Sequence, residues 1–336
     1  MNRNQTIWLI AGAFVLVICL VVGLSLMFEN CLTAKPDPAD TDRTYSGENR
    51  VTIDGRTYLR RNITTYLLIG LDTEGKLENN GSFRNEQQAD FLMLLIADHD
   101  AGTWKMLHIN RDTITPVKTL DIFCRETGRT ENMQIALSHT YGSGTMQSCQ
   151  LTADAVSGLL CGVRIDRYMA VTMGAVPYLT DITGPITVTI PGDMTAIHPS
   201  WTEGAVVKLE GRQALDFVQA RQGAEDQTNI SRMHRQQIFA EALIGSLSNV
   251  LGSKTDTEIY RSYQTYLDYT CTNAPITDTI SLLRQTRQYT YAGTVTPEGT
   301  SKIGSLYGEP VMEFYADSER LKQMVISLML REENGG

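Results

Sequence analysis

Four charged side chains fall where three short apolar segments of the chain begin or end. Asp72 follows the first segment and Asp90 directly precedes the second, while Arg111 and Asp112 directly follow the third. If the second segment is a strand antiparallel to its neighbours, all four lie at one sheet edge, where ligands of α/β sheets tend to bind. Carboxylates suit Mg²⁺ or Mn²⁺, and a guanidinium is a planar fork for phosphate. The set favours a metal-assisted phosphate site, although Asp72 taken alone is better interpreted as an ordinary loop residue.

A second group of polar side chains opens a long predicted helix further along the chain. At 3.6 residues per turn, Arg232 and Gln236 share a stripe with Phe239 and Leu243, so they point toward the interior. An inward arginine at a helix N-terminus suits an anion, because the free N–H groups and the dipole also favour negative charge there. The alternative is an arginine paired with a core carboxylate. Arg235 lies at the margin of the stripe and is expected nearer to solvent.

From about residue 51 the chain alternates strand and helix patterns, which predicts an α/β sandwich. Short apolar runs bounded by polar or turn residues predict strands over 66–70, 91–97, 104–109, 168–171 and 186–190. Turn residues at 98–102 predict a hairpin between the second and third strands. Helices are predicted over 152–162, 174–182, 211–218, 231–250 and 318–330.

The N-terminal part of the chain predicts a membrane anchor. Ile7–Phe28 carries no charge and exceeds the roughly 20 apolar residues that cross a bilayer. Arg3 before it and Glu29 after it place residues 1–6 in the cytoplasm and the rest outside, as a single-pass protein of the cell membrane. Residues 29–50 are a solvated linker and 51–336 a globular domain. The alternative is a cleaved signal peptide, against which the length of the apolar run and the bulky residues after it argue.

Composition and motifs argue against several classes of protein. A net charge of −9 without a basic run gives no support for nucleic-acid binding. The sequence has no G-x-S-x-G elbow, Walker loop or GxGxxG, and its cysteines and histidines show no metal-ligand spacing. Outside the cell a disulfide is allowed, and Cys124 with Cys149 is the predicted pair, because both flank one loop-rich stretch.

A series of segments resembles the LytR-CpsA-Psr family of cell-envelope proteins in order and spacing. They are YLLIGLD at 66–72, QADFLMLLIADHD at 88–100, MLHINRDT at 106–113, QIALSHTYGSG at 134–144, AVSGLLCGVRIDRYMAV at 155–171, ITGPITVTIP at 182–191, LEGRQALDFVQAR at 209–221 and ISRMHRQQIFAEAL at 230–243. The match spans roughly residues 63–250. It implies a three-layer α/β/α sandwich with a mixed central sheet and a deep hydrophobic groove for a polyprenyl tail.

The resemblance also implies an activity and its residues. It implies transfer of a glycan phosphate, such as teichoic acid or capsule, from a polyprenyl-pyrophosphate carrier to peptidoglycan or another envelope acceptor. By motif, Asp72 and Asp90 would hold Mg²⁺. The residues implied as pyrophosphate contacts are Arg111, Arg221, Arg232 and Gln236, and Arg235 is a further candidate.

Two positions depart from the family pattern. The family usually has arginine where this chain has Gln88 and Gln219, so two cationic partners of a diphosphate are missing. Both glutamines remain candidate substrate contacts, and Arg84 is a candidate replacement for one lost arginine.

The mechanism that follows uses Mg²⁺ and arginines to neutralise the pyrophosphate while an acceptor hydroxyl attacks the glycan-linked phosphorus. Asp90 or Asp112 would accept its proton. Two alternatives stay open. Water could attack instead, giving a pyrophosphatase, or the lost arginines could leave a lipid-glycan binding protein or envelope regulator without catalysis.

Overall fold

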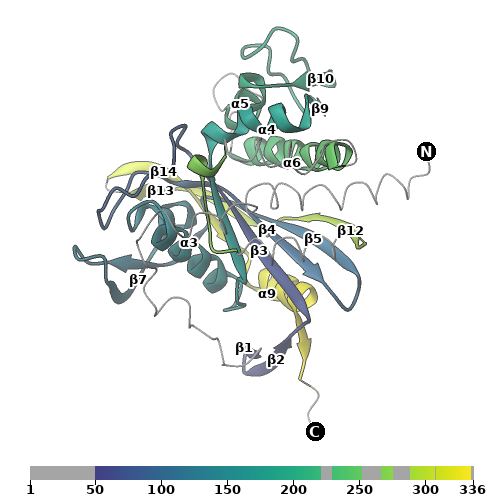
Figure 1. The fold of residues 1–336 in the computed structure, drawn as a ribbon. Coiled ribbons are helices and arrows are strands. Elements are labelled where there is room, and N and C mark those ends of the chain that lie inside the picture. The colour runs from purple at the N-terminus through teal and green to yellow at the C-terminus, as the bar shows by residue number, and fades with distance from the viewer. Residues whose placement is uncertain (1–49, 221–228, 252–265, 275–287, 307, 334–336) are drawn as a thin grey trace, which may run out of the picture.

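A six-stranded mixed sheet lies at the centre of the molecule, in the order β11-β8-β3-β4-β5-β12. The computed structural model describes residues 50–220, 229–251, 266–274, 288–306 and 308–333 (Figure 1). The strands of this sheet are β3 (Ile63–Leu71), β4 (Ala89–Asp98), β5 (Thr103–Ile109), β8 (Arg167–Thr172), β11 (Thr270–Thr272) and β12 (Thr290–Val295). Their long apolar runs suit strands that are covered on both faces.

Strand directions bring several strand ends to one edge of this sheet. β4 runs antiparallel to both β3 and β5, as predicted, and β4 and β5 form the predicted hairpin with Asp98 opposite Thr103. β8 runs parallel to β3, with Thr172 opposite Leu71. The start of β4 therefore lies beside the ends of β3, β5 and β8. We call this the site edge, because it carries Asp72 and Asp90.

Helices cover both faces of the sheet (Figure 1). One core contains Met93 and Leu95 of β4, and the other contains Leu92 and Leu94, because successive strand residues point to opposite faces. The first core is covered by α4 (Val176–Thr183), α5 (Arg212–Gln219) and α6 (Asn229–Leu251). The second is covered by α3 (Met146–Leu159) and α9 (Ser318–Met329).

The first predicted helix begins six residues earlier than expected. Thr152, the first residue of the predicted range, is buried inside α3, and its hydroxyl donates to the Ser148 carbonyl at 3.0 Å. This back-bonding to the residue four positions earlier lets a threonine sit within a helix. The second predicted helix is divided into a 3-10 turn, η2 (Met173–Ala175), and α4.

Other elements form smaller sheets around the central one, and most were not predicted. They are β1 (Arg50–Ile53), β2 (Arg56–Arg60) and β15 (Leu330–Glu332), the hairpins β6 (Ile114–Leu120) with β7 (Glu126–Gln134) and β13 (Gly299–Leu306) with β14 (Glu309–Ala316), and the pair β9 (Ile186–Thr189) with β10 (Val206–Leu209). Two further 3-10 turns are η1 (Ile135–Thr140) and η3 (Leu267–Tyr269). Only the first strand of the β9–β10 pair had a sequence signal.

Two sequence predictions have different outcomes. The predicted span Ile7–Phe28 lies outside the described residues, and none of the helices that the structure does describe is long and apolar enough to cross a membrane. The predicted Cys124–Cys149 disulfide is wrong, because both thiols are free. Cys149 lies on the buried side of α3, with its Sγ 3.6 Å from His139 Nε2.

Candidate functional site

Asp90 is the centre of a buried charge cluster at the site edge. Its Oδ1 accepts a hydrogen bond from Arg111, and its Oδ2 accepts one from Arg232 at 2.8 Å. Asp90 is 7% exposed and Arg232 is 2% exposed, so the pair is largely shielded from water. Arg232 therefore points inward from the start of α6, as its stripe predicted. The predicted alternative, a core carboxylate as its partner, also describes this contact.

Asp72 lies beside Asp90, because β3–β4 pairing places Leu71 opposite Ala89. Its carboxyl reaches the surface, and partial burial, with the charge of Asp90, raises its pKa above the ordinary value. Two carboxylates from distant parts of the sequence therefore meet at one point of the sheet edge.

Gln88 connects the two halves of this cluster. Its backbone N–H donates to Asp72 Oδ1 at 2.7 Å, and its side-chain Oε1 accepts from Arg111. The Gln88 side chain thus contacts a neighbouring arginine and adds no charge to the cluster. A second hydrogen bond, from the Asp72 N–H to the Gln88 carbonyl at 3.1 Å, also holds Asp72 next to Gln88.

Asp112, the other predicted carboxylate, is engaged elsewhere in the cluster. It is 6% exposed, and its Oδ1 accepts from Gln134 Nε2 at 3.0 Å and lies 3.5 Å from Arg111 Nε. Asp112 therefore lies beside Arg111 as a second carboxylate near this guanidinium. Both oxygens of Asp90 also receive guanidinium hydrogen bonds, so both predicted proton acceptors contact Arg111.

Asn229 is a site residue that sequence reasoning missed. Helix α6 begins at this asparagine, two residues before the predicted start. Its Oδ1 accepts from Arg232 at 2.7 Å and its Nδ2 donates to Asn110 Oδ1 at 2.8 Å, so it holds the helix end against the segment after β5. An asparagine before a periodic helical stretch is a capping signal that could have indicated this residue.

Arg235 does not lie near solvent, which corrects the expectation from its stripe position. It is 1% exposed, its Nε donates to the Phe217 carbonyl at 3.0 Å, and its Nη2 donates to the Ala220 carbonyl. These carbonyls lie at the C-terminal end of α5, where helical carbonyls lack partners within the helix. The expected position failed because α5 packs over that side of α6.

The remaining predicted substrate contacts lie in three different settings. Gln219 Nε2 lies 3.5 Å from Asp216 Oδ1 on the same helix. Arg84 stacks on the Tyr141 ring, with its guanidinium carbon 4.4 Å from the ring centre. Arg221 lies outside the described residues.

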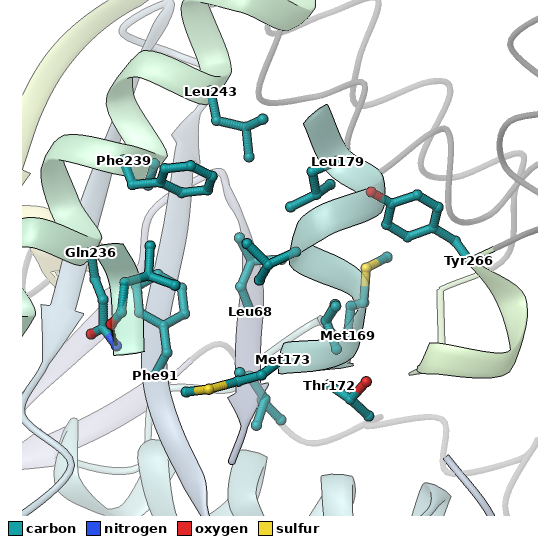
Figure 2. A pocket seen from close by; sticks show the side chains of 16 residues that line it. Leu68, Phe91, Met169, Thr172, Met173, Leu179, Gln236, Phe239, Leu243 and Tyr266 are labelled. Carbon is teal, nitrogen blue, oxygen red and sulfur yellow. Dashed lines mark hydrogen bonds between the residues drawn. The ribbon is translucent and has the colours of Figure 1, made fainter. Parts of the chain in front are cut away.

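An apolar pocket of about 160 Å³ opens beside the charge cluster. Figure 2 shows side chains from the sheet and from the helices above it converging on this space. Phe91 directly follows Asp90, and Gln236 lies one turn after Arg232, so these two residues join the pocket to the cluster. The other lining residues are Leu68, Ile69, Gly70, Met169, Val171, Thr172, Met173, Val176, Leu179, Val218, Phe239, Ala240, Leu243 and Tyr266. Such a lining suits a hydrocarbon chain.

The donor set for a metal consists of carboxylates. Within the described ranges, no group of three or more His, Cys, Asp or Glu side chains could hold an ion. Asp72 and Asp90 form a pair, and Asp90 already shares its oxygens with two guanidiniums. A pair fits Mg²⁺ when substrate oxygens and water complete the coordination, which is usual for Mg²⁺ at phosphate sites.

Comparisons with known proteins give one family and one fold. The profile of the LytR_cpsA_psr family matches residues 31–323. The solved structure of Lin1025 from Listeria innocua is 22% identical, with a TM-score of 0.55 over 79% of this chain and 96% of that one. TagV from B. subtilis is 19% identical, with a TM-score of 0.58 over 80% of this chain and 97% of that one. The structure of TagT bound to LIIa-WTA is 18% identical, with a TM-score of 0.58 over 79% of this chain and 89% of that one. No curated protein sequence matches the chain. At these identities the structural likeness shows the shared mixed α/β fold.

Proposed function

The chain belongs to the LytR-CpsA-Psr family, and from that membership we propose that it transfers a glycan phosphate from a polyprenyl-pyrophosphate carrier to an envelope acceptor such as peptidoglycan. The observation that carries the proposal is the apolar pocket that abuts the Asp90 charge cluster. The apolar lining of the pocket would suit a prenyl tail, and the pyrophosphate at its end would then lie at the arginines. The relative named TagT bound to LIIa-WTA supports a glycan substrate.

The arginines would act on the pyrophosphate by hydrogen bonding and by charge. Arg111 and Arg232 are held in fixed directions by Asp90, Gln88 and Asn229, so little reorganisation is needed when charge develops on the leaving phosphate. Burial of Arg232 strengthens its interaction with an anion, because water screens the charges less.

A bound cation would offset the excess negative charge of this site. The described carboxylates Asp72, Asp90 and Asp112 carry three negative formal charges, whereas Arg111 and Arg232 carry two positive ones. A diphosphate would therefore meet no net positive charge from these five side chains alone. We propose that Asp72 and Asp90 hold Mg²⁺, or Mn²⁺, which supplies positive charge beside the phosphate oxygens. Manganese binding followed by electron paramagnetic resonance should weaken in Asp72→Asn.

A membrane position follows from the same substrate. The carrier lipid stays in the bilayer, so an enzyme anchored there by residues 7–28, with its domain outside the cell, would work at a high effective substrate concentration. Cell fractionation with a protease-protection assay tests this orientation.

Product analysis with a labelled lipid-linked glycan tests the activity. Transfer places label on the acceptor, whereas hydrolysis releases glycan phosphate and binding alone releases nothing. Arg232→Ala should reduce transfer about a hundredfold, while Arg129→Ala, on the exposed hairpin strand β7, should leave it unchanged. If the wild type releases free glycan phosphate although acceptor is present, the protein is a pyrophosphatase and the transferase proposal is wrong.

A further inference from the structure

Thr172 carries a buried hydroxyl that the fold leaves without a hydrogen-bond partner. It directly precedes the turn η2, at a position where threonine commonly caps the following N–H groups, yet its side chain makes no capping bond. Thr172 is 1% exposed, and its Oγ1 has no hydrogen-bond partner within the described structure. A buried hydroxyl without a partner is costly, so a partner from outside the chain is expected at this position.

The hydroxyl lies where the apolar pocket meets the site edge. Parallel pairing places Thr172 opposite Leu71, the residue before Asp72. The Met173 N–H then donates to the Thr73 carbonyl at 2.9 Å, which fixes the chain on the other side of Asp72. Thr172 also lines the pocket (Figure 2). Thr172 therefore belongs to the pocket wall and lies beside the strand end that leads to Asp72.

Two other buried polar atoms in the pocket wall also lack a hydrogen-bond partner in the described structure. They are Gln236 Oε1 and the Tyr266 hydroxyl, whose residues are 5% and 2% exposed. Gln236 lies one turn after Arg232 and so belongs to the site edge. In Figure 2 Tyr266 lies across the pocket from Gln236, beside Leu179 of α4. Burial raises the pKa of Tyr266 well above its ordinary value, so its hydroxyl stays protonated.

We propose that the Thr172 hydroxyl binds the first phosphate oxygen after the lipid tail and so sets how deeply the tail enters the pocket. This inference rests on the proposed function, because it assumes a prenyl phosphate ligand. A hydrocarbon alone would leave the hydroxyl unpaired, whereas a phosphate oxygen accepts its proton. Gln236 Oε1 is a hydrogen-bond acceptor, so it would accept from a water molecule or a ligand hydroxyl near the head group. Tyr266 lies away from the site edge and provides a comparison within the same pocket.

Affinities for a prenyl series test the proposal. The ligands are geranylgeranyl pyrophosphate, geranylgeranyl monophosphate and geranylgeraniol, measured by isothermal titration calorimetry on the full chain in detergent. Thr172→Val, which replaces the hydroxyl by a methyl group, should weaken both phosphates about tenfold and the alcohol about threefold or less, since bonds to charged acceptors are stronger. Thr172→Ser keeps the hydroxyl and should stay within about twofold of wild type.

The sign of the effect decides the outcome. If the hydroxyl stays unpaired in the complex, Thr172→Val leaves affinity unchanged or raises it, and the proposal is overturned. Thr172→Ala gives the same comparison if valine packs poorly. Tyr266→Phe should not weaken either phosphate, and a loss equal to that of Thr172→Val would place the head group elsewhere. If wild-type protein binds neither phosphate, both the proposed function and this inference are wrong. If it binds them and the Thr172 variants bind equally well, only this inference is wrong.

Discussion

Replacing Arg235 by alanine should destabilise the fold and leave ligand affinity nearly intact. Arg235 donates to the carbonyls of Phe217 and Ala220, at the end of α5, and is 1% exposed. Its positive charge also lies at the negative end of a helix dipole, which adds to the stabilisation. Removal of the side chain leaves these carbonyls without their charged donor and opens a cavity between α5 and α6.

The expected size follows from the two hydrogen bonds. A bond to a charged group contributes about 1.5–3 kcal/mol, so losing two should lower the free energy of unfolding by at least about 3 kcal/mol. Each kcal/mol shifts the Tm of a large domain by about 2–4 °C, which gives a fall of about 6–12 °C. The Tm of Arg235→Lys should lie between those of wild type and Arg235→Ala, because lysine keeps the positive charge but lacks the planar guanidinium that donates to two carbonyls.

Thermal melts and urea unfolding measure the stability, and calorimetry below the lowest Tm measures affinity for a prenyl pyrophosphate. Arg129→Ala is the control for loss of an exposed arginine, and it should change neither quantity. Arg232→Ala should lose affinity strongly. The reasoning is refuted if Arg235→Ala keeps its Tm within about 2 °C and loses as much affinity as Arg232→Ala, because Arg235 would then serve the ligand.

Three further predictions concern buried groups. Burial lowers the pKa of His108 and His139 to about 4, so the unfolded chain binds protons that the folded one does not, and stability should fall from about pH 6.5 to pH 4 by up to about 1.4 kcal/mol per pH unit for each histidine. Urea unfolding measured across this pH range should show that the free energy of unfolding depends less steeply on pH in His139→Gln than in wild type. An unchanged pH dependence would contradict the burial argument. Cys149 should resist a thiol reagent until the protein unfolds, whereas Cys124 should react in the native state, as followed by peptide mass spectrometry. Phe239→Ala should weaken binding of a prenyl pyrophosphate about tenfold, because it removes an aromatic wall of the pocket, and unchanged affinity in calorimetry would place the tail elsewhere.

The central part of the site could be predicted because its determinants are local. The segments that became β3, β4 and β5 are apolar runs that end at polar residues, and the turn between the last two fixed their antiparallel order. These two facts bring Asp90 and Arg111 to one edge, and Asp72 joins them because β3 is also antiparallel to β4, an arrangement that had been assumed from the sequence. The inward direction of Arg232 followed in the same way from helical periodicity.

The errors arose where a distant element decides the environment. Periodicity shows which side of α6 Arg235 occupies, but it does not show that α5 packs there. Cys124 and Cys149 are close along the chain, yet Cys149 lies on the inner face of a helix and faces the core. The hairpin β6–β7 has a mostly exposed second strand without alternation, so it gave no strand signal.

The two cores on opposite faces of the sheet restrict how this protein can change during evolution. Along β3 and β8, Leu68, Gly70, Met169 and Val171 line the pocket, whereas Leu67 and Ala170 belong to the core under α3. Substitution at the pocket-facing positions could adapt the chain to another tail or head group without disturbing the other core. An insertion or deletion of one residue in either strand would exchange the two faces and damage both at once. Ligand choice in this fold should therefore diverge by point substitution within the strands, with length changes confined to the loops.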